Sequence, residues 1–165
     1  MNFIRKNAGL PRIPLRYHKN QYIRGVTDVT RAIIVRDGAV LAAQRPTTMS
    51  LPLLWELPGG KIEPDEDPHH CLQRETYEEL RLSIGILERL PHVDRFFRNK
   101  HYRMHPYLCE VTGGTLEVIE HAQATWQPIV HLFDLEWAPA EGMVLRAWMA
   151  ERLATARSEK SIVTR

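Results

Sequence analysis

The chain has 165 residues, of which 44% are hydrophobic and 25% are charged, and its formal net charge is +2. These values indicate one soluble domain with a single core, and so small a net charge does not favour nucleic acid as a partner. No apolar run reaches membrane-spanning length, so no membrane partner is expected. Two cysteines, Cys71 and Cys109, suggest no disulfide framework, which favours a reducing cytoplasm.

Residues 1–28 are predicted to form a basic N-terminal arm. Residues 1–31 contain seven lysines and arginines against a single acidic residue, Asp28. Pro11 and Pro14 argue against a continuous helix. We expect an extended arm that lies on the protein surface or on a partner subunit, so a homodimer stays open. A nucleic-acid-binding tail or an organelle presequence is the less favoured alternative.

Two short strands joined by a tight turn are predicted next. Residues 29–35 and 39–44 are largely apolar, and Asp37-Gly38 between them is a strong hairpin signal. The second strand ends in the sequence QRP at residues 44–46. A polar, proline-containing loop over residues 46–54 then leads to the sequence WELPGG at residues 55–60.

An acidic segment and a helix follow the two glycines. From Glu56 to Glu79 there are eight acidic residues against two basic ones. Asp67 followed by Pro68 predicts a helix start, because Asp caps free backbone amides and Pro tolerates the first helical position. Nothing in the sequence interrupts this helix before Leu80.

Three carboxylates share one face of the predicted helix. Glu75, Glu78 and Glu79 lie at positions i, i+3 and i+4, and Arg74 lies four residues before Glu78. One interpretation is a solvated helix face. The other is a set of oxygen ligands for a hard divalent cation such as Mg²⁺ or Mn²⁺, and the neighbouring glycine pair favours it.

The spacing of these residues resembles the Nudix box of hydrolases that act on nucleoside-diphosphate-linked compounds. Gly60 is followed after five residues by Glu66 and after a further seven by the run RETYEE at residues 74–79. The QRP and WELPGG sequences resemble those of the MutT-like branch of this family. Two residues depart from the pattern: Thr76 replaces the usual aliphatic residue, and Arg81 replaces a glycine that normally ends the helix in a left-handed conformation.

The resemblance implies Mg²⁺ or Mn²⁺ as the cofactor, bound by the helix carboxylates and a glycine carbonyl. In MutT-like enzymes a glutamate a few residues before a tryptophan-bearing strand is a further metal ligand or the general base. Glu120 matches its distance before Trp126, and the alternatives are Glu117 in this role or an unrelated surface role for Glu120. The implied metal ligands are Gly59, Glu75, Glu78, Glu79 and Glu120.

The resemblance also implies the roles of the remaining site residues. Glu79 or Glu120 accepts the proton of the attacking water, and no covalent nucleophile is needed. Lys61 neutralises phosphate charge, while Glu66 and Arg74 brace the loop and the helix. Arg45, at the end of the QRP sequence, contacts phosphate or is an ordinary surface arginine.

The implied activity is hydrolysis of a nucleoside triphosphate, for instance one with an oxidised purine of the 8-oxo-dGTP kind. The products are a nucleoside monophosphate and pyrophosphate, which would place the enzyme in nucleotide pool sanitation. A sugar-nucleotide or dinucleotide hydrolase and a catalytically silent nucleotide-binding module are the alternatives.

The base of the nucleotide is expected to meet Glu141. In MutT-like enzymes a residue after a Pro-Ala pair at the opening of the last helix contacts the base, and Glu141 follows Pro139-Ala140. A carboxylate only accepts hydrogen bonds, which favours bases that offer N–H donors, such as guanine and its oxidised form. The other interpretation is a helix-start residue whose charge suits the dipole.

The rest of the chain predicts further strands and a final helix. Residues 87–97 and 102–111 are predicted strands, with an edge or bulge at Pro106, and residues 113–114 are a predicted turn. Residues 124–127 are a further strand. His92, His101 and His105 are read as polar residues of a sheet face or pocket.

A helix opening at residues 138–141 follows, with Trp148 in the core and a polar, frayed tail from residue 157. We therefore expect an α/β fold of the Nudix type. In this fold a mixed β-sheet lies between helices in an α/β/α sandwich. The expected domain covers residues 29–156, between the basic arm and a polar tail over residues 157–165.

Overall fold

The computed structural model describes residues 25–163, with side chains up to residue 155. In this part of the chain seven strands form one mixed sheet, accompanied by two α-helices and a short 3₁₀ helix. The elements in chain order are β1 (Val26–Arg36), β2 (Ala39–Gln44), β3 (Trp55–Glu56), α1 (Pro68–Leu80), β4 (Leu82–Arg89), β5 (Val93–Phe97), β6 (Lys100–Gly114), β7 (Gln123–Pro128), η1 (Ile129–Asp134) and α2 (Pro139–Val163).

Strand β1 connects two halves of the sheet that diverge from each other. Residues 26–34 pair in parallel with β6, which also pairs with β4 and β5. Only Val35 and Arg36 pair with β2, and β2 in turn pairs with β3 and β7. The free edge of β1 is taken by residues 58–62, whose backbone pairs with it at Asp28, Thr30 and Ala32. The segment before α1 is therefore fixed to the middle of the sheet.

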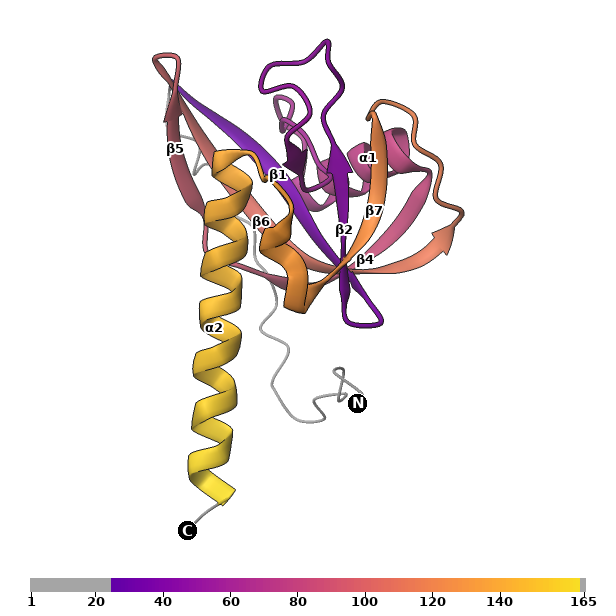
Figure 1. Cartoon of the computed structure of the whole chain (residues 1–165). Coiled ribbons are helices and arrows are strands. Elements are labelled where there is room, and N and C mark those ends of the chain that lie inside the picture. Colours follow the sequence, from indigo (N-terminus) through magenta and orange to yellow (C-terminus); the bar gives the residue numbers. More distant parts are fainter. Residues whose placement is uncertain (1–24, 164–165) are drawn as a thin grey trace.

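The two helices cover opposite faces of the sheet, as the sequence predicted (Figure 1). On one face, Leu72 and Leu80 of α1 pack with β1 and β6 residues such as Ile34. On the other, Leu145 and Trp148 of α2 form a second core with strand residues of the opposite alternation. Side chains alternate between the faces of a strand, so β1 and β6 serve both cores. This is the expected α/β/α arrangement.

The first hairpin forms as predicted, but several boundaries differ from the expected ones. Asp37 and Gly38 both have positive φ, the geometry that an Asp-Gly hairpin turn requires. Strand β1 begins at Val26, so residues 26–28 belong to the sheet and not to the basic arm. The rest of the expected arm, residues 1–24, lies outside the described residues.

The expected strand over residues 87–97 is wrong, because two strands are present there. β4 begins directly after α1 at Leu82, and β5 follows a break at residues 90–92. Residues 113–114, expected as a turn, are the last residues of β6 and pair with the start of β4. Pro106 is not on an edge strand. It lies in β6 where the pairing with β5 ends and the pairing with β4 begins, so its missing N–H falls at an interruption.

Helix α2 is longer than predicted. It continues to Val163 and therefore includes most of the segment that was expected to be a frayed tail from residue 157. Figure 1 shows its C-terminal half extending beyond the sheet. Trp148 is buried in the core, as expected. Within the described chain, neither helix combines the length and apolar character that a membrane crossing requires.

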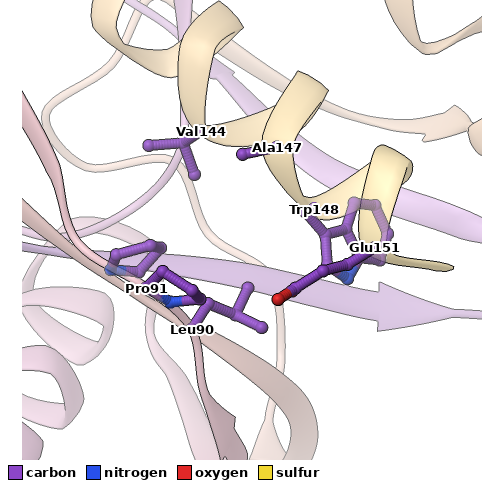
Figure 2. A pocket seen from close by; sticks show the side chains of 7 residues that line it. Leu90, Pro91, Val144, Ala147, Trp148 and Glu151 are labelled. Carbon is purple, nitrogen blue, oxygen red and sulfur yellow. The ribbon is translucent and has the colours of Figure 1, made fainter. Parts of the chain in front are cut away.

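An apolar pocket of about 200 Å³ lies between α2 and the turn that joins β4 to β5 (Figure 2). Trp148 and Glu151 of α2 face Leu90 and Pro91 across it. It lies on the α2 face of the sheet, whereas the helix with the three glutamates covers the other face. The pocket is therefore separate from the three glutamates of α1.

Arg81 ends α1 in the left-handed conformation, with φ 57° and ψ 24°, and its N–H donates to the carbonyl of Tyr77. Glycine adopts this conformation at a lower cost than other residues. Replacing Arg81 with Gly should therefore leave the free energy of unfolding unchanged or raise it by about 1 kcal/mol. The loss of the contact between the Arg81 guanidinium and the Tyr77 ring reduces this gain. Urea denaturation measures this, and a loss of more than about 1 kcal/mol would contradict it.

Candidate active site

The segment of residues 57–61 brings the backbone close to α1. Gly59 has φ 134°, and a Cβ there would overlap the carbonyl of Thr30 on β1. A Cβ on Gly60 would overlap the carboxylate of Glu75. Both positions therefore require glycine, one because of the sheet and the other because a carboxylate lies against the backbone. The loop and the acidic helix face are packed in direct contact.

Helix α1 starts as its sequence predicts. The side chain of Asp67 accepts hydrogen bonds from the backbone amides of His69 and His70, and Pro68 takes the first helical position. Cys71 and Leu72 of the helix are buried, and Glu75 and Glu79 face the loop. Thr76, at the usual aliphatic position, is fully buried, and its hydroxyl has no partner among the described residues.

The three glutamates of α1 differ in exposure. Glu79 is 8% exposed and accepts a hydrogen bond of 3.1 Å from the backbone N–H of Gly59. The Glu75 side chain is 20% exposed and that of Glu78 is 50% exposed. The carboxylates therefore form a gradient from the protein interior to solvent along one helix face.

Arg74 neutralises part of this acidic face. Its Nε and Nη2 donate to the two carboxylate oxygens of Glu66 at 2.8 and 3.0 Å. Its Nη1 donates to Glu75 and to Glu78, both at 3.0 Å. Arg74 therefore contacts Glu78, four residues further along the helix, and also Glu66 in the loop before it. The Arg74 hydrogen bonds lower the pKa of Glu66 to about 2, so this carboxylate stays ionised.

Burial raises the pKa of Glu79 and of Glu75, the opposite of the shift at Glu66. It raises the pKa of Glu79 to about 7, although His121 and the Gly59 amide oppose the shift. Burial also raises the pKa of Glu75, and the negative charges of Glu78 and Glu120 add to this effect while Arg74 opposes it. A carboxyl group that titrates near neutral pH can hold or release a proton under physiological conditions.

A second group of charges surrounds Glu56 on β3. One carboxylate oxygen of Glu56 pairs with Arg45, and the other lies 3.1 Å from Nε2 of His121. Burial would raise the pKa of Glu56, but the hydrogen bond of His121 and the charges of Arg31 and Arg45 lower it. Arg45 also donates to the carbonyl of Ser50, so it is engaged with its own loop.

A third buried pair joins β1 to the first turn of α2. Nε of Arg31 donates to Oε1 of Glu141 at 2.8 Å, and Nη1 donates to the carbonyl of Thr30 at 3.0 Å. The side chains are 12% and 3% exposed. Burial would lower the pKa of Arg31, but Glu141, Glu56 and Glu79 raise it. The Arg31–Glu141 pair therefore lies within electrostatic reach of the acidic site.

Sequence reasoning missed Arg31 and His121. The signal for Arg31 was a charged residue inside the apolar run of β1, where alternation places it on the α2 face with Val29 and Ile33. His121 carries no such signal. It follows Glu120 in an irregular segment, and only the folded chain places it beside Glu56 and Glu79.

The carboxylate oxygens of α1 are of the ligand type that a divalent cation such as Mg²⁺ prefers. Within the described residues, no three His, Cys, Asp or Glu side chains are already placed to hold a metal ion. Arg74 holds Glu75 and Glu78, and Glu79 faces the Gly59 amide. The donor set nevertheless consists of carboxylates at graded depth next to glycine backbone, which is the ligand type that Mg²⁺ and Mn²⁺ prefer. The residues fit such an ion once the carboxylates turn from Arg74.

The family model described as the NUDIX domain matches residues 26–149. The chain belongs to the Nudix hydrolase family. The match begins at the first residue of β1 and ends within α2, so it spans both cores and the acidic helix.

Similar proteins place this Nudix hydrolase in the MutT-like branch. The CTP pyrophosphohydrolase of Escherichia coli (strain K12) is 36% identical over 127 residues, which is 77% of this chain and 94% of that protein. A Mycobacterium tuberculosis (strain H37Rv) protein with the provisional name 8-oxo-dGTP diphosphatase 2 is 33% identical over 83% of this chain and 95% of its own. The crystal structure of the MutT NUDIX hydrolase from Burkholderia pseudomallei has a TM-score of 0.67 and 26% identity, covering 74% of this chain and 97% of that one.

The structure of this Nudix hydrolase brings most of the predicted site residues together. Gly59, Glu66, Arg74, Glu75, Glu78 and Glu79 form one connected cluster. Glu120 is exposed, and its charge acts on Glu75, so it lies near that cluster. Lys61 is exposed beside the cluster, on the segment that pairs with β1. Arg45 and Glu141 instead have buried partners of their own, Glu56 and Arg31.

The pKa of Glu79 predicts how the stability of the metal-free enzyme depends on pH. Between its ordinary value of 4.5 and about 7, the unfolded chain loses this proton while the folded chain keeps it. The free energy of unfolding in EDTA should therefore fall as pH rises through this window, by roughly 3 kcal/mol at most. In Glu79→Gln this contribution is absent. The free energy of unfolding of the variant, relative to that of the wild type, should therefore increase from pH 5 to pH 8. Denaturant titrations at both pH values measure the difference, and parallel pH profiles would contradict the assignment.

His121 should matter for stability because it is a buried partner of Glu56. His121→Ala leaves one oxygen of a buried carboxylate without its hydrogen bond, which should lower the free energy of unfolding by about 1–3 kcal/mol. His131→Ala is the matched control, since His131 pairs with Asp134 at the surface and should change stability by less than about 0.5 kcal/mol. Equal losses in the two variants, measured by urea denaturation, would show that the contact with Glu56 contributes nothing.

Proposed function

We propose that this Nudix hydrolase cleaves nucleoside triphosphates into a nucleoside monophosphate and pyrophosphate with the help of Mg²⁺ or Mn²⁺. The observation that carries the proposal is the carboxylate face of α1, packed against Gly59 and Gly60. Three glutamates on one face repel each other, and neither the core nor the helix requires them. Binding of a divalent ion, which in turn binds a polyanionic substrate, would explain why these carboxylates lie together.

The metal would be held by Glu75, Glu78 and Glu79, with Glu120 and the carbonyl of Gly59 as further ligands. When bound, the metal neutralises phosphate charge, polarises a phosphoryl oxygen and lowers the pKa of water. Arg74 donates to both Glu75 and Glu78, which keeps these two carboxylates together. Glu66 fixes Arg74 by two hydrogen bonds, so the loop and the helix stay in register.

The proton of the attacking water would be accepted by Glu79 or Glu120. Glu79 is buried and has a pKa of about 7, which suits exchange of a proton near neutral pH. Glu120 is exposed on a segment whose backbone amides at Glu117 and Ile119 donate to the last carbonyls of α1. Lys61 is exposed at the edge of the cluster and would offset phosphate charge. Arg45 would offer its remaining donors to phosphate.

The substrate we favour is a guanine nucleotide, including its oxidised form. Glu141 is a buried carboxylate that accepts hydrogen bonds, and guanine presents N–H donors on N1 and on its exocyclic amine. The name of the Mycobacterium relative supports an oxidised guanine substrate. Cytosine nucleotides are the second candidate, because the E. coli relative is named a CTP pyrophosphohydrolase.

The metal ligands can be tested by removing one charge at nearly constant shape. Glu78→Gln should fold normally and lower the kcat for triphosphate hydrolysis by about 100-fold or more, since the metal that neutralises phosphate charge would lose a charged ligand. Glu88→Gln, on the exposed side of β4, is the matched control and should keep its turnover. EDTA should abolish hydrolysis, and added Mg²⁺ should restore it.

The assay follows the release of monophosphate and pyrophosphate by chromatography at limiting Mg²⁺. Near-normal turnover of Glu78→Gln would remove Glu78 from the metal ligands. Release of inorganic phosphate and a diphosphate in place of pyrophosphate would contradict the proposed bond cleavage.

A further inference from the structure

The hairpin formed by β5 and the first residues of β6 carries a local positive charge that the small net charge of the whole chain conceals. Residues 93–103 contain four lysines and arginines against a single acidic residue, Asp94. The carboxylate of Asp94 is engaged by Arg103, whose Nε and Nη2 donate to its two oxygens at 2.8 and 3.2 Å. The ion pairs of the hairpin all involve Asp94, so three of its cations form no ion pair among the described residues: Arg95, Arg98 and Lys100.

Phe96 on β5 exposes one face of its ring to solvent. The residue is 73% exposed, although phenylalanine is apolar. The other face of the ring stacks on His101, its partner on β6, with ring centroids 4.4 Å apart and ring planes at 21°. His101 is held in turn by Asp94, whose Oδ1 lies 3.0 Å from Nε2. The Phe96 ring is therefore fixed in one orientation, and its open face can take a second planar group.

The tip of the hairpin places a further cation close to this ring. Phe97 pairs with Lys100, so Arg98 and Asn99 form a two-residue turn, in which they have φ values of 48° and 59°. Asparagine tolerates this left-handed conformation, whereas arginine adopts it at a cost that glycine would avoid. The guanidinium of Arg98 lies 5.2 Å from the centroid of the Phe97 ring. The hairpin thus combines aromatic rings with exposed cations at its tip.

The basic N-terminal arm joins the fold beside this hairpin. Residues 1–24 contain six lysines and arginines and no acidic residue. The described structure begins at Gly25, and Val26 pairs with His101 of the hairpin. Figure 1 shows β5 well apart from α1, which carries the glutamates. Positive charge is therefore concentrated in the hairpin and in the segment attached next to it, away from the acidic helix.

We propose that the β5–β6 hairpin binds single-stranded nucleic acid. A base stacks on the open face of Phe96, and the cations Arg95, Arg98 and Lys100 bind phosphates of the strand. A single strand fits better than a duplex, because only an unpaired base offers a face that is not already stacked on its neighbours. An anionic membrane would also attract the cations, but the Phe96 ring is stacked flat on His101 and suits a planar partner. The inference does not depend on the proposed hydrolysis.

The test measures binding of a fluorescein-labelled oligodeoxythymidine of about 12 nucleotides by fluorescence anisotropy. EDTA is present, so the α1 carboxylates repel phosphate and the active site does not capture the strand. An abasic strand of the same length has the phosphates but no base to stack, and the wild type should bind it about tenfold more weakly than oligodeoxythymidine.

Variants of the hairpin separate stacking from charge. Phe96→Ala should weaken binding of oligodeoxythymidine about tenfold and leave its salt dependence unchanged. Arg98→Gln should lower the slope of log Kd against log salt concentration by about 0.7, the value for one lost phosphate contact with a single strand. Phe133→Ala and Arg146→Gln are the matched controls, since Phe133 on η1 is also exposed and the Arg146 guanidinium lies 5.0 Å from its ring centroid. Both controls should bind as the wild type does.

Thermal unfolding checks that each variant is folded, and the slope of Arg98→Gln keeps the test open should Phe96→Ala fail to fold. The inference is overturned if the wild type does not bind the oligonucleotide at low salt, or if the abasic strand binds equally well. Equal losses in the control and the hairpin variants would also overturn it. Binding to phosphatidylserine vesicles without binding to the oligonucleotide would identify a membrane surface in its place.

Discussion

The backbone of residues 58–62 pairs with the free edge of β1, and the site depends on this pairing. The amides of Thr30 and Ala32 donate to the carbonyls of Gly60 and Pro58, and the amide of Ile62 donates to Asp28. The edge is free because β2 pairs with β1 only at Val35 and Arg36, beside the hairpin turn, and diverges from the rest of the strand. Gly59 and Gly60 are thereby fixed between the sheet and α1, where the absence of a side chain allows two carboxylates to contact the backbone. The divergence of the sheet thus leaves an edge for the loop, and the loop in turn holds the glycines against the acidic face of α1.

Charges in this enzyme are arranged in partnered groups around that loop. Glu66, Glu75 and Glu78 share Arg74 on the exposed side. Glu56 has Arg45 and His121, and Glu141 has Arg31. Glu79 has no cationic partner in direct contact in the described chain, only the Gly59 amide, and its pKa is raised by burial. Among these carboxylates Glu79 therefore has the fewest partners, which suits the proton exchange or metal binding proposed for it.

The features that could be predicted from the sequence are those with local causes. Asp67 and Pro68 specify the helix start, Asp37-Gly38 specifies the hairpin, and the spacing of the glutamates specifies a common face. Even the exit of α1 through Arg81 keeps the left-handed geometry that glycine would have. In each case a few neighbouring residues determine the backbone conformation, so this conformation can be predicted from the sequence.

Features set by distant contacts could not be predicted in this way. The start of β4 at Leu82 depends on pairing with the end of β6, and Gly85 within it weakens the strand signal. Helix α2 continues past residue 157, where the sequence has neither Pro nor Gly to end it, although its apolar period has ended. Arg31 and His121 became site residues only through partners 110 and 65 positions away in the chain. Local spacing cannot identify a partner so far away in the chain, even where, as for Arg31, a charge inside an apolar run is unusual.

Mn²⁺ binding, followed by electron paramagnetic resonance, would show whether the α1 carboxylates hold a divalent cation. Titration of the protein into Mn²⁺ at pH 8 reports the free ion without any need for turnover. We expect at least one Mn²⁺ to bind per chain and the affinity to drop about tenfold or more in Glu75→Gln, whose carboxylate lies against Gly60. Equal Mn²⁺ binding by the wild type and this variant, or no binding with nucleotide present, would show that these carboxylates do not form a metal site.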